Sequence, residues 1–321
     1  MGPGPAAGPL RERLRERWRG FWPAAGLLLL VMLLSPLSAS PLGLMAIIGV
    51  PAAVAILTFE PPQSGSAALA LLLLAGAGLG FREAEPMWFM ERGWALLLAG
   101  GFALGTALAP DRGLFDRSLA AVAIAGATVA ALAVLRPGLP ADLDWRITAQ
   151  LSAALAAYDF SAWGGRSVEA TVRGIVSAWE AVYPALLALA SISALGVVGY
   201  IVGRVRGEPR PLPPLREFRF GDQLAWVLVL GLALLVLPAG AWADRAGGNM
   251  VTVMGGLYLL RGLAVLVWLG ASVLSSGWAI GAWVLAALIL YPVTVGAALV
   301  MGISDTWLDL RSRPGVKTDG A

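Results

Sequence analysis

The residues of this chain that could do chemistry are a few charged or polar side chains inside long apolar stretches. Arg261 lies in the run GGLYLLRGLAVLVWLG, residues 255–270, near the middle of an expected membrane span. Placing an arginine at the centre of a bilayer costs about 2.5–3.5 kcal/mol, so its guanidinium should face protein or water. Three interpretations stay open: a structural ion pair, an anchor for an anionic ligand, or a water-filled cleft behind a half-helix at 249–260.

Two further polar residues accompany Arg261 in the predicted ligand-binding set. Glu180 lies just inside an expected span, where a carboxylate can reach water in a cavity or snorkel to the interface. Asn249 opens the span that contains Arg261. Asp222, which precedes another apolar run, is predicted to be a helix N-cap.

Asp305, Asp309 and Arg313 follow the last apolar segment at intervals of four residues. This spacing predicts one shared helical face beyond the last span. Such a face is more typical of solvated surface than of a cation or proton site.

The absence of cysteine and histidine excludes most familiar catalytic chemistry. Without these residues the chain has no disulfide, thiolate nucleophile, imidazole base or imidazole metal ligand. The sequence also has no phosphate-binding G-x-x-x-x-G-K-[ST] loop. We therefore expect no enzyme, no cofactor and no metal. The arginines lie largely in short loops. In such loops they set the orientation of the membrane spans and do not indicate nucleic-acid binding.

Composition indicates an all-α polytopic membrane protein. Of 321 residues, 58% are hydrophobic and 13% charged, whereas soluble domains carry roughly 25% charged residues; the mean hydropathy is +0.77. Nine apolar segments predict a transmembrane helical bundle with eight or nine spans, at 21–38, 43–59, 66–81, 88–109, 117–135, 179–203, 223–242, 249–273 and 278–302.

Between the fifth and sixth segments, the apolar residues recur every three to four positions. Leu143, Ile147 and Leu151 belong to one such series, and Val168 and Val172 belong to a second. The pattern predicts two amphipathic helices, separated at 164–165. They would form either an interfacial lid over a cavity or a helical hairpin on the outer face of the bundle.

The arginine distribution predicts the orientation and the domain boundaries. Five arginines precede the first segment and five lie between 204 and 219, so both regions should be cytoplasmic, with six spans between them. If the three further segments all crossed the membrane, the C-terminal tail would lie outside the cell. Its basic residues instead favour the cytoplasmic side. The expected parts are a basic tail at 1–20, a six-span bundle at 21–205, a linker at 206–222, C-terminal membrane helices at 223–303 and a tail at 304–321.

The order of motifs in the C-terminal third resembles the YybS-like family of bacterial membrane proteins. The motifs are Glu217-Phe218-Arg219-Phe220, then Leu-Arg-Gly-Leu-Ala-Val at 260–265, and Gly302-Ile-Ser-Asp-Thr-Trp-Leu-Asp-Leu-Arg311. The resemblance implies a set of signature residues: Arg219, Gly262, Gly302, Asp305, Trp307, Asp309 and Arg311. That family is in turn similar to the substrate-binding membrane subunits of energy-coupling-factor transporters, which implies a six-helix fold for the first part of the chain.

These observations lead to two functional hypotheses. The first is binding or transport of a small solute, with Arg261, Glu180 and Asn249 lining the site. The second is a membrane scaffold or regulator that recruits a membrane-protein partner through the basic 204–219 loop and the C-terminal tail. Either protein would be a multi-pass component of the bacterial cytoplasmic membrane, surrounded by the lipid bilayer.

Overall fold

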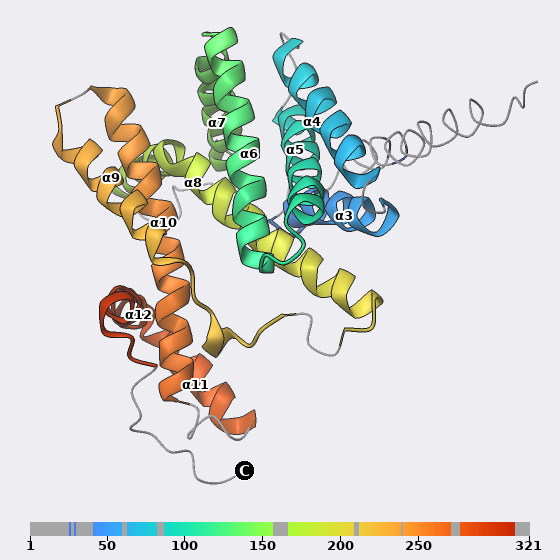
Figure 1. The fold of residues 1–321 in the computed structure, drawn as a ribbon. Coiled ribbons are helices and arrows are strands. Elements are labelled where there is room, and N and C mark those ends of the chain that lie inside the picture. The colour runs from blue at the N-terminus through green and yellow to red at the C-terminus, as the bar shows by residue number, and fades with distance from the viewer. Residues whose placement is uncertain are drawn as a thin grey trace, which may run out of the picture. The chain divides into compact units, whose positions relative to one another are not determined.

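The computed structural model describes residues 26, 29, 41–59, 63–81, 87–156, 166–208, 212–238, 240–270 and 277–311. Within these residues the regular structure is entirely helical, without a strand, which confirms the predicted all-α class (Figure 1). The first expected span, at 21–38, lies outside the described residues apart from Gly26 and Leu29.

The chain forms two compact units. Unit 1 comprises Met1–Glu180 and Ala190–Leu212, and unit 2 comprises Ala181–Leu189 and Pro213–Ala321. The long helix α8 (Arg166–Val205) contributes a segment to each unit.

Unit 1 is built around α5 (Met87–Leu108), which packs against α3 (Pro41–Thr58), α4 (Gln63–Phe81) and α6 (Leu114–Leu135). These helices are apolar on several faces, so they bury aliphatic side chains against one another. The fully buried members of this core include Ile47, Ile48, Leu71, Leu97, Leu98 and Leu195.

Only one of the two expected amphipathic helices is a separate element. It is α7 (Leu139–Ala156), in which Ile147 is buried and Trp145 is exposed. The second continues without a break into the sixth expected span, and together they form the 40-residue helix α8. The start of the sixth apolar segment at residue 179 is therefore not the start of a helix, and Pro184 lies within α8.

Three helices among the described residues are long and apolar enough to cross a membrane: Leu114–Leu135, Val176–Val205 and Ala241–Leu269. A fourth candidate arises if the bent pair formed by α11 (Gly277–Ile289) and α12 (Tyr291–Leu308) is counted as one span. The apolar parts of α3, α4 and α5, and the apolar helix at Asp222–Val236, are shorter, at 10–17 residues. The chain is thus a helical membrane protein with several spans.

In unit 2, α9 (Ala225–Val236) and α10 (Ala241–Leu269) form an antiparallel hairpin. Gly231 of α9 lies against Met250, and Gly247 lies against Leu235. The break falls at 237–240 rather than at the predicted 243–248. Leu237 is extended before Pro238, as a residue preceding proline prefers, and Gly240 adopts a positive φ of 90°.

The remaining helices of unit 2 bear on two further predictions. Helix α10 is continuous through residues 249–261, so the half-helix interpretation of Arg261 is wrong. The apolar segment at 278–302 is divided between α11 and α12, which meet at 101°. Leu290 separates the two helices and Pro292 lies in the first turn of α12, where its missing N–H is not needed.

Candidate functional site

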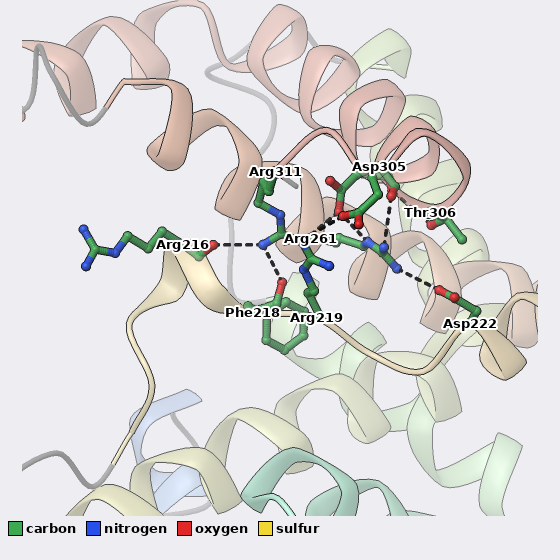
Figure 2. A network of polar contacts seen from close by, with 10 residues as sticks. Arg216, Phe218, Arg219, Asp222, Arg261, Asp305, Thr306 and Arg311 are labelled. Atoms are coloured by element: carbon green, nitrogen blue, oxygen red, sulfur yellow. Dashed lines mark hydrogen bonds and ion pairs between the residues drawn. The ribbon is translucent and has the colours of Figure 1, made fainter. Parts of the chain in front are cut away.

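Several charged residues of unit 2 converge on Arg261, at a point where three segments meet (Figure 2). The segments are the loop at 212–222, the C-terminal part of α10 and the end of α12. We call the group the Arg261 cluster; its members are Arg216, Phe218, Arg219, Phe220, Asp222, Arg261, Asp305, Asp309 and Arg311.

Arg261 is paired directly with Asp305. Its Nε donates to Asp305 Oδ2 at 2.9 Å, and its Nη2 donates to the Asp305 backbone carbonyl at 3.1 Å. Arg261 is 3% exposed and Asp305 is 0% exposed. A buried charge is tolerated when it is paired and hydrogen-bonded, so each residue makes the burial of the other possible.

Arg311 binds the same carboxylate and also holds the loop. Its Nη2 donates to Asp305 Oδ2 at 2.7 Å, while Nη1 donates to the carbonyls of Arg216 and Phe218 at 2.8 and 3.0 Å. Asp305 therefore lies between two guanidinium groups. Asp222 supplies a second carboxylate, with its Oδ1 3.6 Å from Arg261 Nη1.

Arg219 and Asp309 form a more exposed ion pair at the edge of the cluster. Arg219 Nη2 lies 2.8 Å from Asp309 Oδ1, and both side chains are about half exposed. Asp309 has a φ of 39° and ends α12, so it does not continue the helical face of Asp305. The prediction of one solvated face for Asp305 and Asp309 is wrong, because Asp305 is buried; Arg313 lies outside the described residues.

Aromatic packing fixes the loop against α10. Phe220 is buried, and its ring centroid lies 5.2 Å from the guanidinium carbon of Arg261. The same ring makes an edge contact with Tyr258, one turn earlier on α10, at 5.2 Å between centroids. Phe218 packs edge-on against Phe220 at 6.4 Å. The loop thus contributes an aromatic face to the buried cation.

Two glycines bring α10 and α12 close enough for the ion pair to form. A Cβ at Gly262 would overlap the backbone carbonyl of Ala298, and a Cβ at Gly302 would overlap that of Tyr258. The two helix backbones are therefore in direct contact where they cross. In Figure 1, α12 is seen nearly end-on beside α10, which is seen from the side, so the two helices cross rather than run parallel.

Asn249 occupies a different place in unit 2 and makes no contact that points to a ligand. Its Oδ1 accepts from the Ala185 N–H at 2.9 Å, and its Nδ2 donates to the carbonyls of Ala181 and Arg245, each at 2.8 Å. In a regular helix the Ala185 N–H would bond to the Ala181 carbonyl. The Asn249 amide bridges these two groups in the turn of α8 that contains Pro184.

The structure brings most of the signature residues together, and three predicted residues, Asn249, Glu180 and Trp307, are not part of the Arg261 cluster. Glu180 belongs to unit 1, and Trp307 is 70% exposed on α12. Asp222 is not an N-cap: Gly221 holds that position without a side-chain bond, and Asp222 pairs with Arg261 instead. Sequence reasoning missed the role of Tyr258, although the Phe-Arg-Phe motif at 218–220 marked its aromatic partner.

The Arg261 cluster is a set of ion pairs and hydrogen bonds that holds three segments of unit 2 together. Its central arginines, Arg219, Arg261 and Arg311, are balanced by three aspartates, Asp222, Asp305 and Asp309. Within the described part of the chain, no group of three or more acidic side chains could hold a metal ion. The cluster joins the loop at 212–222 to two helices through neutralised charges.

Comparison with known proteins identifies one related family. A family model described as "Predicted membrane protein (DUF2232)" matches residues 26–306. No curated protein and no solved structure matches the chain.

Proposed function

We propose that this chain, which belongs to the DUF2232 family of predicted membrane proteins, is a membrane scaffold or regulatory protein. Unit 2 would be the platform that presents the loop at 212–222, and with it the end of α12, to an acidic protein partner. The observation that carries this proposal is the direct pairing of Arg261 with Asp305.

The pairing argues against Arg261 as an anchor for an anionic solute. An anchor needs positive charge that is left unneutralised until the ligand arrives. Arg261 instead has Asp305 at 2.9 Å and Asp222 at 3.6 Å, and Phe220 covers its guanidinium. The exposed loop residue Arg216 is better suited to meet a partner. Its side chain is 56% exposed, its ion pair with Glu217 is long at 3.8 Å, and only its backbone carbonyl takes part in the Arg261 cluster.

Binding or transport of a small uncharged solute is the second candidate. Tyr258 Oη and Asp305 Oδ1 are buried without a hydrogen-bond partner among the described residues, and Arg261 Nη1 has only the ion pair with Asp222. Buried polar atoms are rarely left unpaired, so a water or a small polar solute would satisfy them. The resemblance to the substrate-binding subunits of energy-coupling-factor transporters supports this second candidate function.

The proposal also includes the number of membrane spans and their orientation, which the helices alone do not fix. We propose eight or nine spans in the bacterial cytoplasmic membrane, with the N-terminus inside. The number of apolar segments and the arginines at 11–19 and 204–219 support this arrangement.

In-cell photocrosslinking tests the scaffold function. A photoreactive amino acid at Leu215, which is 45% exposed in the loop, should give one discrete protein adduct. The same probe at Val300, an exposed apolar position of α12, is the control and should give only lipid adducts. Arg216→Glu should abolish the adduct at 215, whereas Arg216→Lys should preserve it because charge, not shape, attracts an acidic partner.

Two results would contradict the scaffold function. One is the absence of a protein adduct at 215 in cells of the native host. The other is a small molecule that remains bound in native mass spectrometry of the purified protein and is lost in Tyr258→Phe. That second outcome would favour the solute-binding candidate.

A further inference from the structure

The contacts between the loop at 212–222 and the end of α12 constrain the path of the chain through the membrane. Arg311, which follows α12, donates to the loop carbonyls of Arg216 and Phe218. Arg219 of the loop pairs with Asp309, also beyond α12. These contacts join segments about 90 residues apart, so both segments must lie at the same depth in the membrane.

That depth is a membrane–water interface. The charged side chains around the contacts are substantially exposed: Asp222 is 76% exposed, and Arg216, Glu217, Arg219 and Asp309 are 45–58% exposed. Ionised groups with this exposure would be very unfavourable in hydrocarbon, because lipid tails cannot solvate them. Arg261 lies 3.6 Å from the exposed Asp222 and therefore belongs to the same level rather than to the bilayer midplane.

The hairpin of α9 and α10 leads away from this interface and back to it. Asp222 precedes α9 and lies beside Arg261 of α10, while Gly231 lies beside Met250 near the far end. Between Arg245 and Arg261, α10 carries no charged residue. This stretch is about 24 Å long at 1.5 Å per residue, close to a hydrocarbon core of roughly 30 Å. Helix α9 with the turn before it, Asp222–Val236, is shorter than a full candidate span but lies alongside this stretch of α10, so we take the hairpin to make two crossings.

We infer that the loop at 212–222 and the C-terminal end of α12 lie on the same, cytoplasmic face of the membrane. The chain from α9 to α12 then makes an even number of crossings, and the bent pair α11–α12 enters and leaves by one face. The 101° bend between these helices suits a re-entrant path. The five arginines between 204 and 219 assign the shared face to the cytoplasm.

This arrangement removes the conflict between three apolar segments after the linker and a basic C-terminal tail. It also makes the loop and the end of α12 one composite surface instead of two separate ones. The inference does not depend on the proposed scaffold function, because it rests only on contacts within unit 2 and on the solvation of charge.

Cysteine accessibility tests the inference, since the native chain contains no cysteine. Single substitutions Leu215→Cys, Leu308→Cys and Trp242→Cys place thiols in the loop, at the end of α12 and at the tip of the hairpin; the three native side chains are 45–68% exposed. A membrane-impermeant maleimide would be applied to intact cells and to inverted vesicles of the full-length protein.

The expected result is that positions 215 and 308 react only in inverted vesicles, whereas position 242 reacts only in intact cells. Labelling of 215 and 308 from opposite faces would overturn the inference. So would failure of 308 to react from either face, because the inference places this position at the aqueous interface. Neither outcome would bear on partner binding at the loop, so a failure here is distinguishable from a failure of the proposed function.

Discussion

Asp305 of α12 neutralises Arg261 of α10, with 2.9 Å between Oδ2 and Nε and both side chains buried. The two residues are 44 positions apart in the sequence, so their pairing depends on how α10 and α12 cross. Helix α12 can bring the carboxylate this close only because Gly262 and Gly302 allow the backbones to touch. The ion pair and the glycine contact are thus parts of one structural feature.

Loss of the Asp305 charge should destabilise the protein far more than loss of the Asp309 charge. Asp305→Asn leaves the buried guanidiniums of Arg261 and Arg311 without their shared carboxylate, which should cost about 3–5 kcal/mol. Asp309→Asn removes only a half-exposed pair and should cost about 1 kcal/mol or less. Asparagine also tolerates the left-handed backbone at 309. Reversible unfolding in mixed micelles measures both changes, and equal losses would contradict the assignment.

Gly302→Ala should separate α10 from α12. The added Cβ would overlap the Tyr258 carbonyl, and a backbone atom cannot rotate away as a side chain can. We expect a loss of about 3 kcal/mol or more, because overpacking of a rigid contact is costly. Gly296→Ala is the matched control on the same helix, since nothing lies within 4 Å of its Cβ. Unfolding curves that do not distinguish the two variants would show that the close crossing is absent.

Asn249→Leu should weaken α8 at Pro184. The substitution leaves the Ala185 N–H and the Ala181 carbonyl without the side chain that bridges them, at an expected cost of about 1–3 kcal/mol. Amide exchange at Ala185 should become faster. Thr252→Val serves as the control, because the Thr252 hydroxyl donates only within its own helix, to Gly248. Unchanged exchange at Ala185 in Asn249→Leu would refute the bridging role.

Tyr258→Phe should leave stability unchanged or raise it slightly. The Tyr258 hydroxyl is buried and has no hydrogen-bond partner among the described residues, so its removal avoids a desolvation penalty. The ring contact with Phe220 is retained. Thermal unfolding of the purified protein provides the measurement. A clear loss of stability would instead indicate a bound water or solute at this hydroxyl and would favour the solute-binding candidate.

The sequence predicts the helical membrane class well, because hydropathy depends on composition and not on how helices pack. The signature residues implied by the resemblance include several members of the Arg261 cluster, namely Arg219, Asp305, Asp309 and Arg311, but not Arg216 or Asp222. What the sequence misses is the pairing itself. The four-residue spacing of Asp305 and Asp309 suggested one exposed face, yet Asp309 leaves the helix in a left-handed conformation and Asp305 turns inward to two arginines.

Helix boundaries are harder to predict from apolar runs than helix class is. Residues 237–240 end α9 through local backbone conformation at Pro238 and Gly240, although the surrounding residues remain apolar. Pro184 would be expected to interrupt α8, yet the helix continues, and Asn249, more than 60 residues away in the sequence, bonds to the Ala185 N–H and the Ala181 carbonyl beside the proline. Local backbone conformation decides the first case and a contact between distant segments bears on the second, and the apolar pattern of the sequence displays neither.

The central claim, that Arg261 is held by Asp305 and not left to bind a ligand, is tested most directly by a double-mutant cycle. The free energy of unfolding would be measured for the native protein, Arg261→Gln, Asp305→Asn and the combined variant. The predicted coupling energy is about 1.5 kcal/mol or more, since each substitution alone removes the partner of a buried charge. Losses that add to within about 0.5 kcal/mol would show that the two side chains do not interact and would contradict the account.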